Sequence, residues 1–275
     1  MNDKNAKRVK LEKLLRDINM SSTYSAKILS AFDMCDCTTE LYDIGALKAE
    51  INLSVCAGNQ EKTIMLFLVL ITEERENGAW VRYPEDIFIH TVSDFSSFVR
   101  FYKEATGEEG YGKGAWPMHY AEARIFRLGE FEFEIISDGT DKRVEIHIPE
   151  GADLCPEQLS KSLVLKDEFF KRYLPEWNDI RIECASWMLS PVLKDILSEG
   201  SRILWFQSMF DIFDTEPDNN FYLQFVFDLE YIQWCNGYDL AKLPEKTSLQ
   251  RKLKRFVLNG GKPGIARGWL KEEAL

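Results

Sequence analysis

The chain has 275 residues, of which 45% are hydrophobic, 29% charged and 13% aromatic. These proportions are typical of a folded protein with a substantial core and exclude a disordered chain. The net charge of -11 argues against duplex nucleic acid as a partner, because such binding depends on basic groups that neutralise phosphates. The longest apolar run, Ile64–Ile71, is far shorter than a membrane span, so we expect no membrane insertion.

Neither the cysteines nor the histidines have the spacing of a metal site. No C-x-x-C pair occurs, and His90, His119 and His147 are scattered along the chain, so we predict no metal. The charged N-terminal segment MNDKNAKRVKLEKLL has no apolar core and does not resemble a secretory signal. We therefore expect free thiols in a reducing cytoplasm, and hence a cytoplasmic protein.

The first part of the chain predicts helices. A stripe of apolar residues at helical spacing indicates the first one: Leu11, Leu14, Leu15 and Ile18. Further helices are predicted over about Thr39–Cys56, over Glu61–Asn77 and over Pro84–Gly107. The glycine-rich loop Thr106–Pro117 then separates helical from strand-like sequence. We place the domain boundary near Ala121, which divides the chain into a helical domain, 1–121, and a second domain, 122–275.

The second part is predicted to run strand, strand, helix, strand, helix, strand, strand. The first two strands, Arg124–Ile136 and Arg143–Pro149, are joined by a short DGTDK turn and should form a hairpin. In the first, Phe131 and Phe133 alternate with glutamates, which indicates one polar face. A helix ending near Tyr173 follows.

The remaining predicted elements lie after that helix. They are the strand Arg181–Leu189, the short helical segment Pro191–Gly200, and two nearly continuous apolar runs, Ile203–Phe206 and Phe221–Phe227. Continuous apolar runs of this length are typical of interior strands, and we predict strands for both.

The C-terminal segment Lys246–Arg267 has seven basic residues and no acidic one. Thr247 or Ser248 can cap a helix in it, and Gly260–Gly261 can end that helix. The segment either binds an anionic ligand or docks on the protein's own acidic surface, and we favour docking. The glycines of Gly260–Gly268 either approach a phosphate or form a flexible turn, which we favour.

The loop Glu150–Gln158 joins the hairpin to the following helix and is a candidate anion site. Backbone N–H groups at a helix start can bind phosphate, although most loops of this kind bind nothing. The common nucleotide-binding glycine motifs are absent from the chain.

Titratable side chains lie just before this loop and on the next strand. Glu145 and His147 share a strand face, and Glu183 lies on the next strand. A histidine titrates near neutrality and can serve as a general base, and the alternative for His147 is a hydrogen-bonded structural role at the end of a strand. Cys184 and Trp187 are better explained as packing residues, because no nucleophile motif surrounds them.

Several segments together carry a family resemblance: RIFRLGEFEFE, EIHIPEG, IECASWML, LPEKTSLQRKL and GGKPGIARG. They resemble bacterial acyltransferase domain-containing proteins, which have a helical N-acyltransferase N-terminal domain and a GNAT-like C-terminal domain. The resemblance implies an α+β protein in which a helical domain precedes a GNAT-like mixed β-sheet with flanking helices. Val144–Ile148 resembles the fourth GNAT strand and Ile180–Met188 the fifth, which splay apart to admit an acyl-pantetheine arm.

The resemblance also implies an activity, the transfer of an acetyl or other acyl group from coenzyme A to a small amine or similar acceptor. Glu145, His147 or Glu183 is then the proton acceptor, and Tyr173 or Tyr222 is a candidate proton donor to the thiolate. The residues implied to hold coenzyme A are Ile148, Gly151, Ala152, Cys155 and Glu157.

The chain departs from the superfamily at two points. The usual loop pattern, (Q/R)-x-x-G-x-(G/A), is replaced by EGADLCPEQL, and the helical segment after the fifth strand contains no tyrosine. A catalytically inactive GNAT-like module that binds a small molecule or a protein is therefore the alternative.

Overall fold

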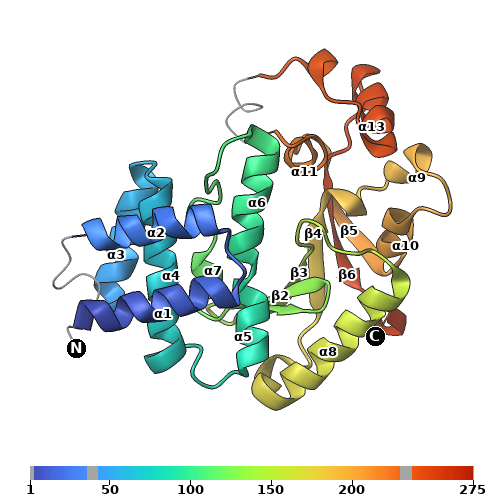
Figure 1. The fold of residues 1–275 in the computed structure, drawn as a ribbon. Coiled ribbons are helices and arrows are strands. Elements are labelled where there is room, and N and C mark those ends of the chain that lie inside the picture. Colours follow the sequence, from blue (N-terminus) through green and yellow to red (C-terminus); the bar gives the residue numbers. More distant parts are fainter. Residues whose placement is uncertain (1–2, 36–42, 230–236, 275) are drawn as a thin grey trace. The chain divides into compact units, whose positions relative to one another are not determined.

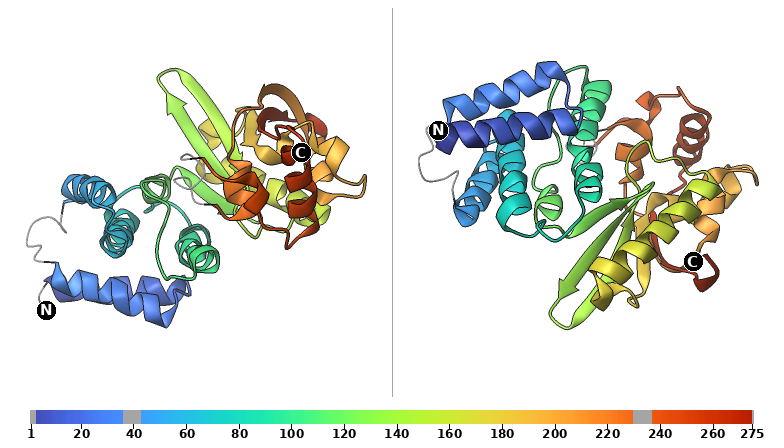
Figure 2. Two further views of the ribbon diagram at one scale, coloured as in Figure 1. Left: turned by 90° about the horizontal axis from the view of Figure 1, so that it is seen from above. Right: turned by 60° about the horizontal axis from the view of Figure 1, so that its bottom comes forward.

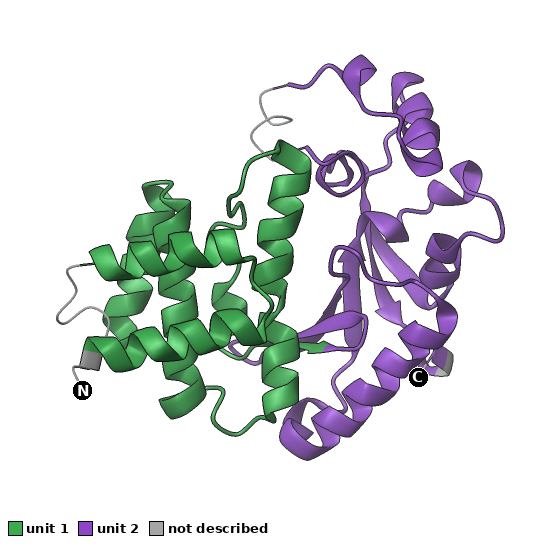
Figure 3. Cartoon of the chain, in the orientation of Figure 1, with its two compact units in different colours: residues 1–127 green, residues 128–275 purple. Residues whose placement is uncertain are grey.

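The computed structural model describes residues 3–35, 43–229 and 237–274, and the chain divides into two compact units. Unit 1 is Met1–Arg127 and unit 2 is Leu128–Leu275, coloured green and purple in Figure 3. The division falls slightly after the boundary that we predict near Ala121.

Unit 1 consists mainly of helices. Their bounds are α1 Asp3–Asp17, α2 Ser22–Met34, α3 Ile44–Cys56, α4 Gln60–Asn77, α5 Glu85–Val92, α6 Asp94–Thr106 and α7 Met118–Ala121. The predicted helix Pro84–Gly107 is divided at Ser93 into α5 and α6. The predicted start of the third helix, Thr39, lies outside the described residues. α3 begins after Asp43, whose side chain accepts a hydrogen bond from the N–H of Ala46 at 2.7 Å.

Helix α4 is the core of unit 1, and its predicted bounds are confirmed to within one residue. Every side chain from Ile64 to Ile71 is buried. Helices α1, α2, α3 and α7 all contact α4, which explains how a helix that is apolar on all sides is stable in a folded protein.

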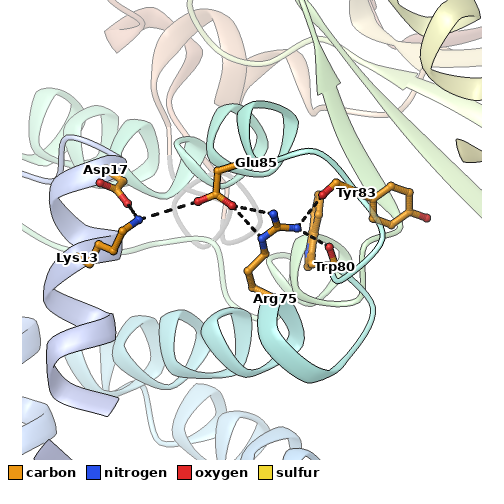
Figure 4. Close-up of polar contacts among 6 residues, drawn as sticks. All are labelled: Lys13, Asp17, Arg75, Trp80, Tyr83 and Glu85. Atoms are coloured by element: carbon orange, nitrogen blue, oxygen red, sulfur yellow. Dashed lines mark hydrogen bonds and ion pairs between the residues drawn. The ribbon is translucent and has the colours of Figure 1, made fainter. Parts of the chain in front are cut away.

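A polar cluster near the end of α4 connects three helices of unit 1 (Figure 4). The Arg75 guanidinium donates hydrogen bonds to the carbonyls of Trp80 at 2.6 Å and Tyr83 at 2.8 Å, and it pairs with Glu85 at 2.7 Å. The other carboxylate oxygen of Glu85 lies 4.0 Å from Lys13 Nζ on α1. Arg75 thus satisfies two carbonyl groups of the loop that joins α4 to α5.

One mixed sheet of six strands runs through the described residues. The strands are β1 Ile125–Leu128, β2 Phe131–Asp138, β3 Asp141–His147, β4 Ile182–Ser186, β5 Phe210–Glu216 and β6 Ile265–Leu270, in the spatial order β1-β2-β3-β4-β6-β5 (Figure 1). Strands β3 and β4 are parallel, whereas β2–β3, β4–β6 and β5–β6 are antiparallel. The predicted hairpin, β2–β3, is confirmed. The single strand predicted over Arg124–Ile136 is two strands, separated by a turn at Gly129, where φ is +69°.

Helix α8, Pro156–Tyr173, runs along the sheet of unit 2 (Figure 2). It packs on β2, and the rings of Phe133 and Phe170 have centroids 6.2 Å apart. The Oγ of Ser162 on α8 accepts a hydrogen bond from the N–H of Glu130 at 2.7 Å. Strand alternation places one set of buried residues together on a single face of the sheet: Phe131, Phe133, Val144, Ile146, Ile182 and Cys184.

Two predicted strands are helices. Residues 202–208 form α10, Arg202–Ser208, and the following strand β5 begins only at Phe210. Residues 222–227 form α11, Tyr222–Phe227. In α11 the residues Tyr222, Leu223, Val226 and Phe227 are buried, whereas Phe221 and Phe225 are exposed. That burial pattern is helical, and a short apolar run alone does not distinguish it from a strand.

The C-terminal helix is confirmed, and the segment after it is ordered differently from our prediction. Helix α13, Ser248–Leu258, begins with a capping box in which Thr247 and Gln250 exchange hydrogen bonds. The prediction of a flexible turn over Gly260–Gly268 is wrong, because strand β6 begins at Ile265 and lies between β4 and β5. Basic residues of the segment pair with the protein's own carboxylates, as predicted for docking: Lys254–Glu245, Lys262–Asp218 and Arg267–Glu216.

The other helices that the structure describes in unit 2 are short. They are α9, Leu193–Ile196, where a short helical segment is predicted, and the 3₁₀ turns Pro175–Trp177, Trp187–Leu189, Leu240–Lys242 and Glu272–Ala274. Cys56, Cys155 and Cys184 are free thiols, as expected, but the expectation is wrong for Cys35, which is disulfide-bonded. Over the described ranges, no helix is long and apolar enough to cross a membrane.

Candidate functional site

The parallel strands β3 and β4 pair over a short distance. Their ladder joins Val144 to Ile182 and Glu145 to Glu183. Beyond these pairs β3 continues to His147 along β2, and β4 continues to Ser186 along β6. Each strand therefore extends past the shared ladder with its outer neighbour, which is the arrangement expected where two adjacent strands begin to separate.

Three glutamates form a row across the sheet at the end of this ladder. Glu134 on β2 is opposite Glu145 on β3, and Glu145 is opposite Glu183 on β4. Glu134 and Glu183 are 3% and 6% exposed. Directly opposed like charges destabilise a sheet, so packing alone does not account for this glutamate row (Glu134, Glu145 and Glu183).

Two side chains, those of His147 and Arg143, contact glutamates of this row. The Nε2 of His147 lies 2.9 Å from Glu134 Oε2, and the Nε of Arg143 lies 3.1 Å from Glu183 Oε1. Burial, and then the negative charge of Glu145, raise the pKa of the Glu183 carboxyl, while Arg143 partly counteracts them. A carboxyl group whose pKa is raised toward neutrality is suited to proton transfer.

The loop after β3 uses several of its N–H groups internally. Gly151 has a φ of +84°, and the N–H of Ala152 donates to the carbonyl of Pro149 at 3.1 Å. The N–H of Asp153 donates to the Glu130 carboxylate at 2.8 Å. The Asp153 carboxylate in turn accepts from the N–H of Cys155 at 3.0 Å. Two N–H groups of the loop, those of Gly151 and Leu154, make no hydrogen bond to any described residue.

Carboxylates and one arginine surround the start of α8. The Glu157 carboxylate accepts a hydrogen bond from the Cys155 thiol and raises the pKa of that thiol. Arg202, at the start of α10, pairs with Asp153 at 2.7 Å. A pyrophosphate at this loop would meet two available N–H groups and Arg202, and it would replace the Asp153 carboxylate at the Cys155 N–H. The loop therefore fits coenzyme A only together with a local exchange of these contacts.

The other sequence-predicted candidates lie in different surroundings. Ile148 is half-buried in the loop directly after β3. Cys184 is fully buried, and burial raises its pKa well above the usual range, so it is a packing residue. Tyr173 is the last residue of α8, ~25 Å along the helix from the loop, so a role as proton donor there is excluded.

Tyr222 lies in an apolar cluster together with α13, and burial raises the pKa of its phenol to about 12. Such a phenol is a weak proton donor to a thiolate. Trp187 packs against the same cluster, in agreement with its predicted packing role. Among the described residues, no group of three or more histidine, cysteine or acidic side chains is arranged to hold a metal ion.

Sequence reasoning did not name Glu134, Arg143 or Arg202, which contact the candidate residues in the structure. The signal for Glu134 was present, because glutamates alternate with buried phenylalanines in β2. The register that places Glu134 beside His147 depends on the turn of the hairpin. The register that places Glu183 opposite Glu145 depends on the parallel pairing of two strands that are far apart in the sequence.

The comparisons with known proteins concern the family and the fold. The family model described as GNAT-like C-terminal domain matches residues 125–270. The chain belongs to this family. The match begins at β1 and ends at β6, so it includes the whole sheet.

Solved structures show the same fold over nearly the whole chain. An acyltransferase mutant in complex with octanoyl-CoA superposes with a TM-score of 0.77 at 22% identity, over 94% of this chain and 87% of that one. An acyltransferase in complex with decanoyl-CoA and teicoplanin gives a TM-score of 0.76 at 21% identity, with the same coverage. No match is found among curated proteins. The chain thus has a helical N-terminal region and a GNAT-like mixed sheet, in a fold shared with acyltransferases solved with acyl-CoAs.

Proposed function

We propose that the protein is an acyl-CoA-dependent acyltransferase that acts on a small amine or a similar nucleophile. The observation that carries the proposal is the glutamate row with His147, placed where the ladder between β3 and β4 ends. Proton acceptors at this point lie next to the opening that an acyl-pantetheine arm would need.

The chemistry requires one proton acceptor and a polarised carbonyl. The acceptor nitrogen attacks the thioester carbonyl carbon while its proton passes to His147, Glu145 or Glu183, directly or through water. Backbone N–H groups at the end of β3 polarise the carbonyl oxygen. The C–S bond then breaks, and the coenzyme A thiolate leaves and takes a proton from the protonated base or from water.

The coenzyme would bind at the loop after β3. Its phosphates would be contacted by the N–H groups of Gly151 and Leu154 and by the Arg202 guanidinium. The N–H of Cys155 would also contact them once the Asp153 carboxylate has moved away. Ile148, Ala152 and Glu157 lie along the same path. The sequence favours an acetyl group, whereas the similar solved proteins carry octanoyl or decanoyl groups, so the chain length of the donor is the first property to measure.

A thermal-shift titration with acetyl-, octanoyl- and decanoyl-CoA tests binding. A ligand at about 100 times its Kd stabilises the native state by about 2.7 kcal/mol. Release of free thiol across a panel of primary amines then tests turnover. Binding without turnover supports the alternative, an inactive GNAT-like module, which is favoured by the internally occupied loop N–H groups. If millimolar acyl-CoA neither stabilises the protein nor is turned over, the proposal is refuted.

Arg202→Ala is the variant that tests the site. It should weaken acyl-CoA binding, whereas Lys262→Ala, which removes a similarly exposed cation paired with Asp218, should leave binding unchanged. Equal affinities for the two variants would place the coenzyme elsewhere.

A further inference from the structure

We propose that Phe213 and Trp269 form an aromatic platform that binds the ring of an aromatic amine. The two rings lie on the same face of the sheet as the glutamate row, so the amine group of such a ligand can reach the carboxylates of that row. The role of the ligand as the acyl acceptor rests on the proposed function, whereas its binding is tested without any acyl transfer.

The aromatic platform consists of two stacked rings, one of which is open to solvent. The ring centroids of Phe213 and Trp269 are 4.6 Å apart, and the ring planes are inclined by 21°. Phe213 is 47% exposed. Rings that are this close to parallel present a flat apolar surface, and a further planar ring can pack on it in an offset stack.

A β-bulge in strand β5, at the edge of the sheet, brings Phe213 to this position. The register between β5 and β6 shifts between Ile212 and Asp214, so Phe213 has no partner in the ladder. A bulge changes the direction of a side chain, and bulges are frequent next to active sites. The exposed ring of Phe213 is therefore held on Trp269 by the backbone of the edge strand.

The register of the sheet connects the platform to the glutamate row. Trp269 is directly opposite Glu183 on β4, and Glu183 is directly opposite Glu145 on β3. Directly opposite residues share a face of a sheet, and this face is the one opposite to that of the buried Cys184. Only β6 lies between β4 and β5, so these two strands are about 10 Å apart. A short carbon chain therefore suffices to join a ring on the platform to an amine group at Glu183.

The charges beside the platform favour an ammonium group as the second part of the ligand. The guanidinium carbon of Arg181 lies 4.8 Å from the centroid of the Trp269 ring, the distance of a cation–π contact. Arg143 pairs with Glu183 at 3.1 Å. The Glu145 side chain, by contrast, forms no ion pair or hydrogen bond with any residue that the structure describes. An ammonium group complements this carboxylate, and it gives one proton to water before the neutral amine attacks.

Pairing of the two rings within the sheet does not explain the platform by itself. Cross-strand aromatic pairs stabilise a sheet, which accounts for the contact between Phe213 and Trp269. An exposed apolar side chain on an edge strand, however, favours association with other chains. A ligand ring on the platform removes this apolar surface from water.

Saturation-transfer nuclear magnetic resonance with 4-phenylbutylamine tests binding to the full chain without coenzyme A. We expect saturation of the ring protons of the ligand, and a Kd that rises about 10-fold in Phe213→Ala. Phe213→Leu, which keeps an apolar contact but no ring, should also bind more weakly, whereas Phe213→Tyr keeps the ring and should bind like the wild type. Phe225→Ala is the matched control, because Phe225 on α11 is 56% exposed, and its Kd should not change.

Two results of this titration would overturn the inference. One is the absence of saturation transfer from the wild-type protein at millimolar 4-phenylbutylamine, and the other is an unchanged Kd in both Phe213→Ala and Phe213→Leu. The uncharged analogue 4-phenyl-1-butanol should bind about threefold more weakly than the amine, and equal affinities would overturn the assignment to an amine. Size-exclusion chromatography tests the other occupant. A wild-type dimer that Phe213→Ala separates into monomers would assign the surface to a second copy of the chain and overturn the inference.

Kinetics with decanoyl-CoA test the role as the acceptor site. The wild type should prefer 4-phenylbutylamine to n-butylamine about 10-fold in kcat/KM, and Phe213→Ala should lose most of this preference, whereas Phe225→Ala should keep it. A preference that Phe213→Ala retains would overturn the inference while leaving acyl transfer intact. Ring binding that depends on Phe213, in a protein that transfers no acyl group, would instead refute the proposed function and leave the binding site in place.

Discussion

Gly129→Ala should destabilise unit 2 far more than the same change at another glycine of similar backbone conformation. Gly129 joins β1 to β2 with a φ of +69°. A Cβ built there lies 3.2 Å from both Cα and Cβ of Ser162 on α8, and closer still to its Oγ. The Ser162 hydroxyl cannot simply turn away, because it accepts the hydrogen bond from the N–H of Glu130.

The magnitude follows from three contributions. A left-handed backbone costs alanine about 1–2 kcal/mol, and the loss of chain entropy in the unfolded state offsets about 0.4–1 kcal/mol of it. Losing the partner of this partly buried N–H adds up to about 1–3 kcal/mol, the cost for a fully buried group. Gly139 in the β2–β3 turn has a φ of +63° and open space around the position of a Cβ, so Gly139→Ala carries only the first two contributions. The two variants should therefore differ by up to about 1–3 kcal/mol.

Urea unfolding followed by circular dichroism measures the difference. Hydrogen exchange over α8 gives a local reading, since a chain of two units need not unfold in one step. In a Ser162→Ala background the hydrogen bond and the contact with the hydroxyl are already absent, so Gly129→Ala should cost less than it does in the wild-type background, although the 3.2 Å contacts with Cα and Cβ of residue 162 remain. Equal costs of the two glycine variants in the wild-type background would refute the reasoning.

Three further predictions concern unit 2. Because burial and Glu145 raise the pKa of Glu183, its ionisation opposes folding as pH rises, so Glu183→Gln should gain stability over the parent as pH rises above about 4.5; a difference in urea midpoint that is constant with pH would contradict this. Glu157→Gln should lower the pKa of the Cys155 thiol, because the Glu157 carboxylate raises it. Iodoacetamide should then alkylate Cys155 faster at about pH 8. Peptide mass spectrometry measures the rate, with the exposed thiol of Cys56 as internal reference. Thr247→Ala removes the capping box of α13 and should cost about 1 kcal/mol in urea unfolding, whereas Ser248→Ala beside it should cost clearly less.

The sequence by itself determined the elements whose signals are local. The uninterrupted apolar run in Glu61–Asn77, which exceeds the length of a strand, identified α4. Alternation and a short turn identified the β2–β3 hairpin, and the possible capping residues Thr247 and Ser248 marked the start of α13. The likeness of several segments to a GNAT-like family supplied the fold class, and the family match over residues 125–270 confirms it.

Only the tertiary structure decided which distant residues meet. Residues 203–206 and 221–227 are apolar enough for strands, yet they are helical because burial of one helical face against the core outweighs strand propensity. The placement of β6 between β4 and β5, and of Glu183 opposite Glu145, are pairings between segments far apart in the chain. No local pattern encodes such a register, since it is set by the faces that the whole sheet must bury. The glutamate row, and with it the contact between Glu134 and His147, exists only once that register is formed.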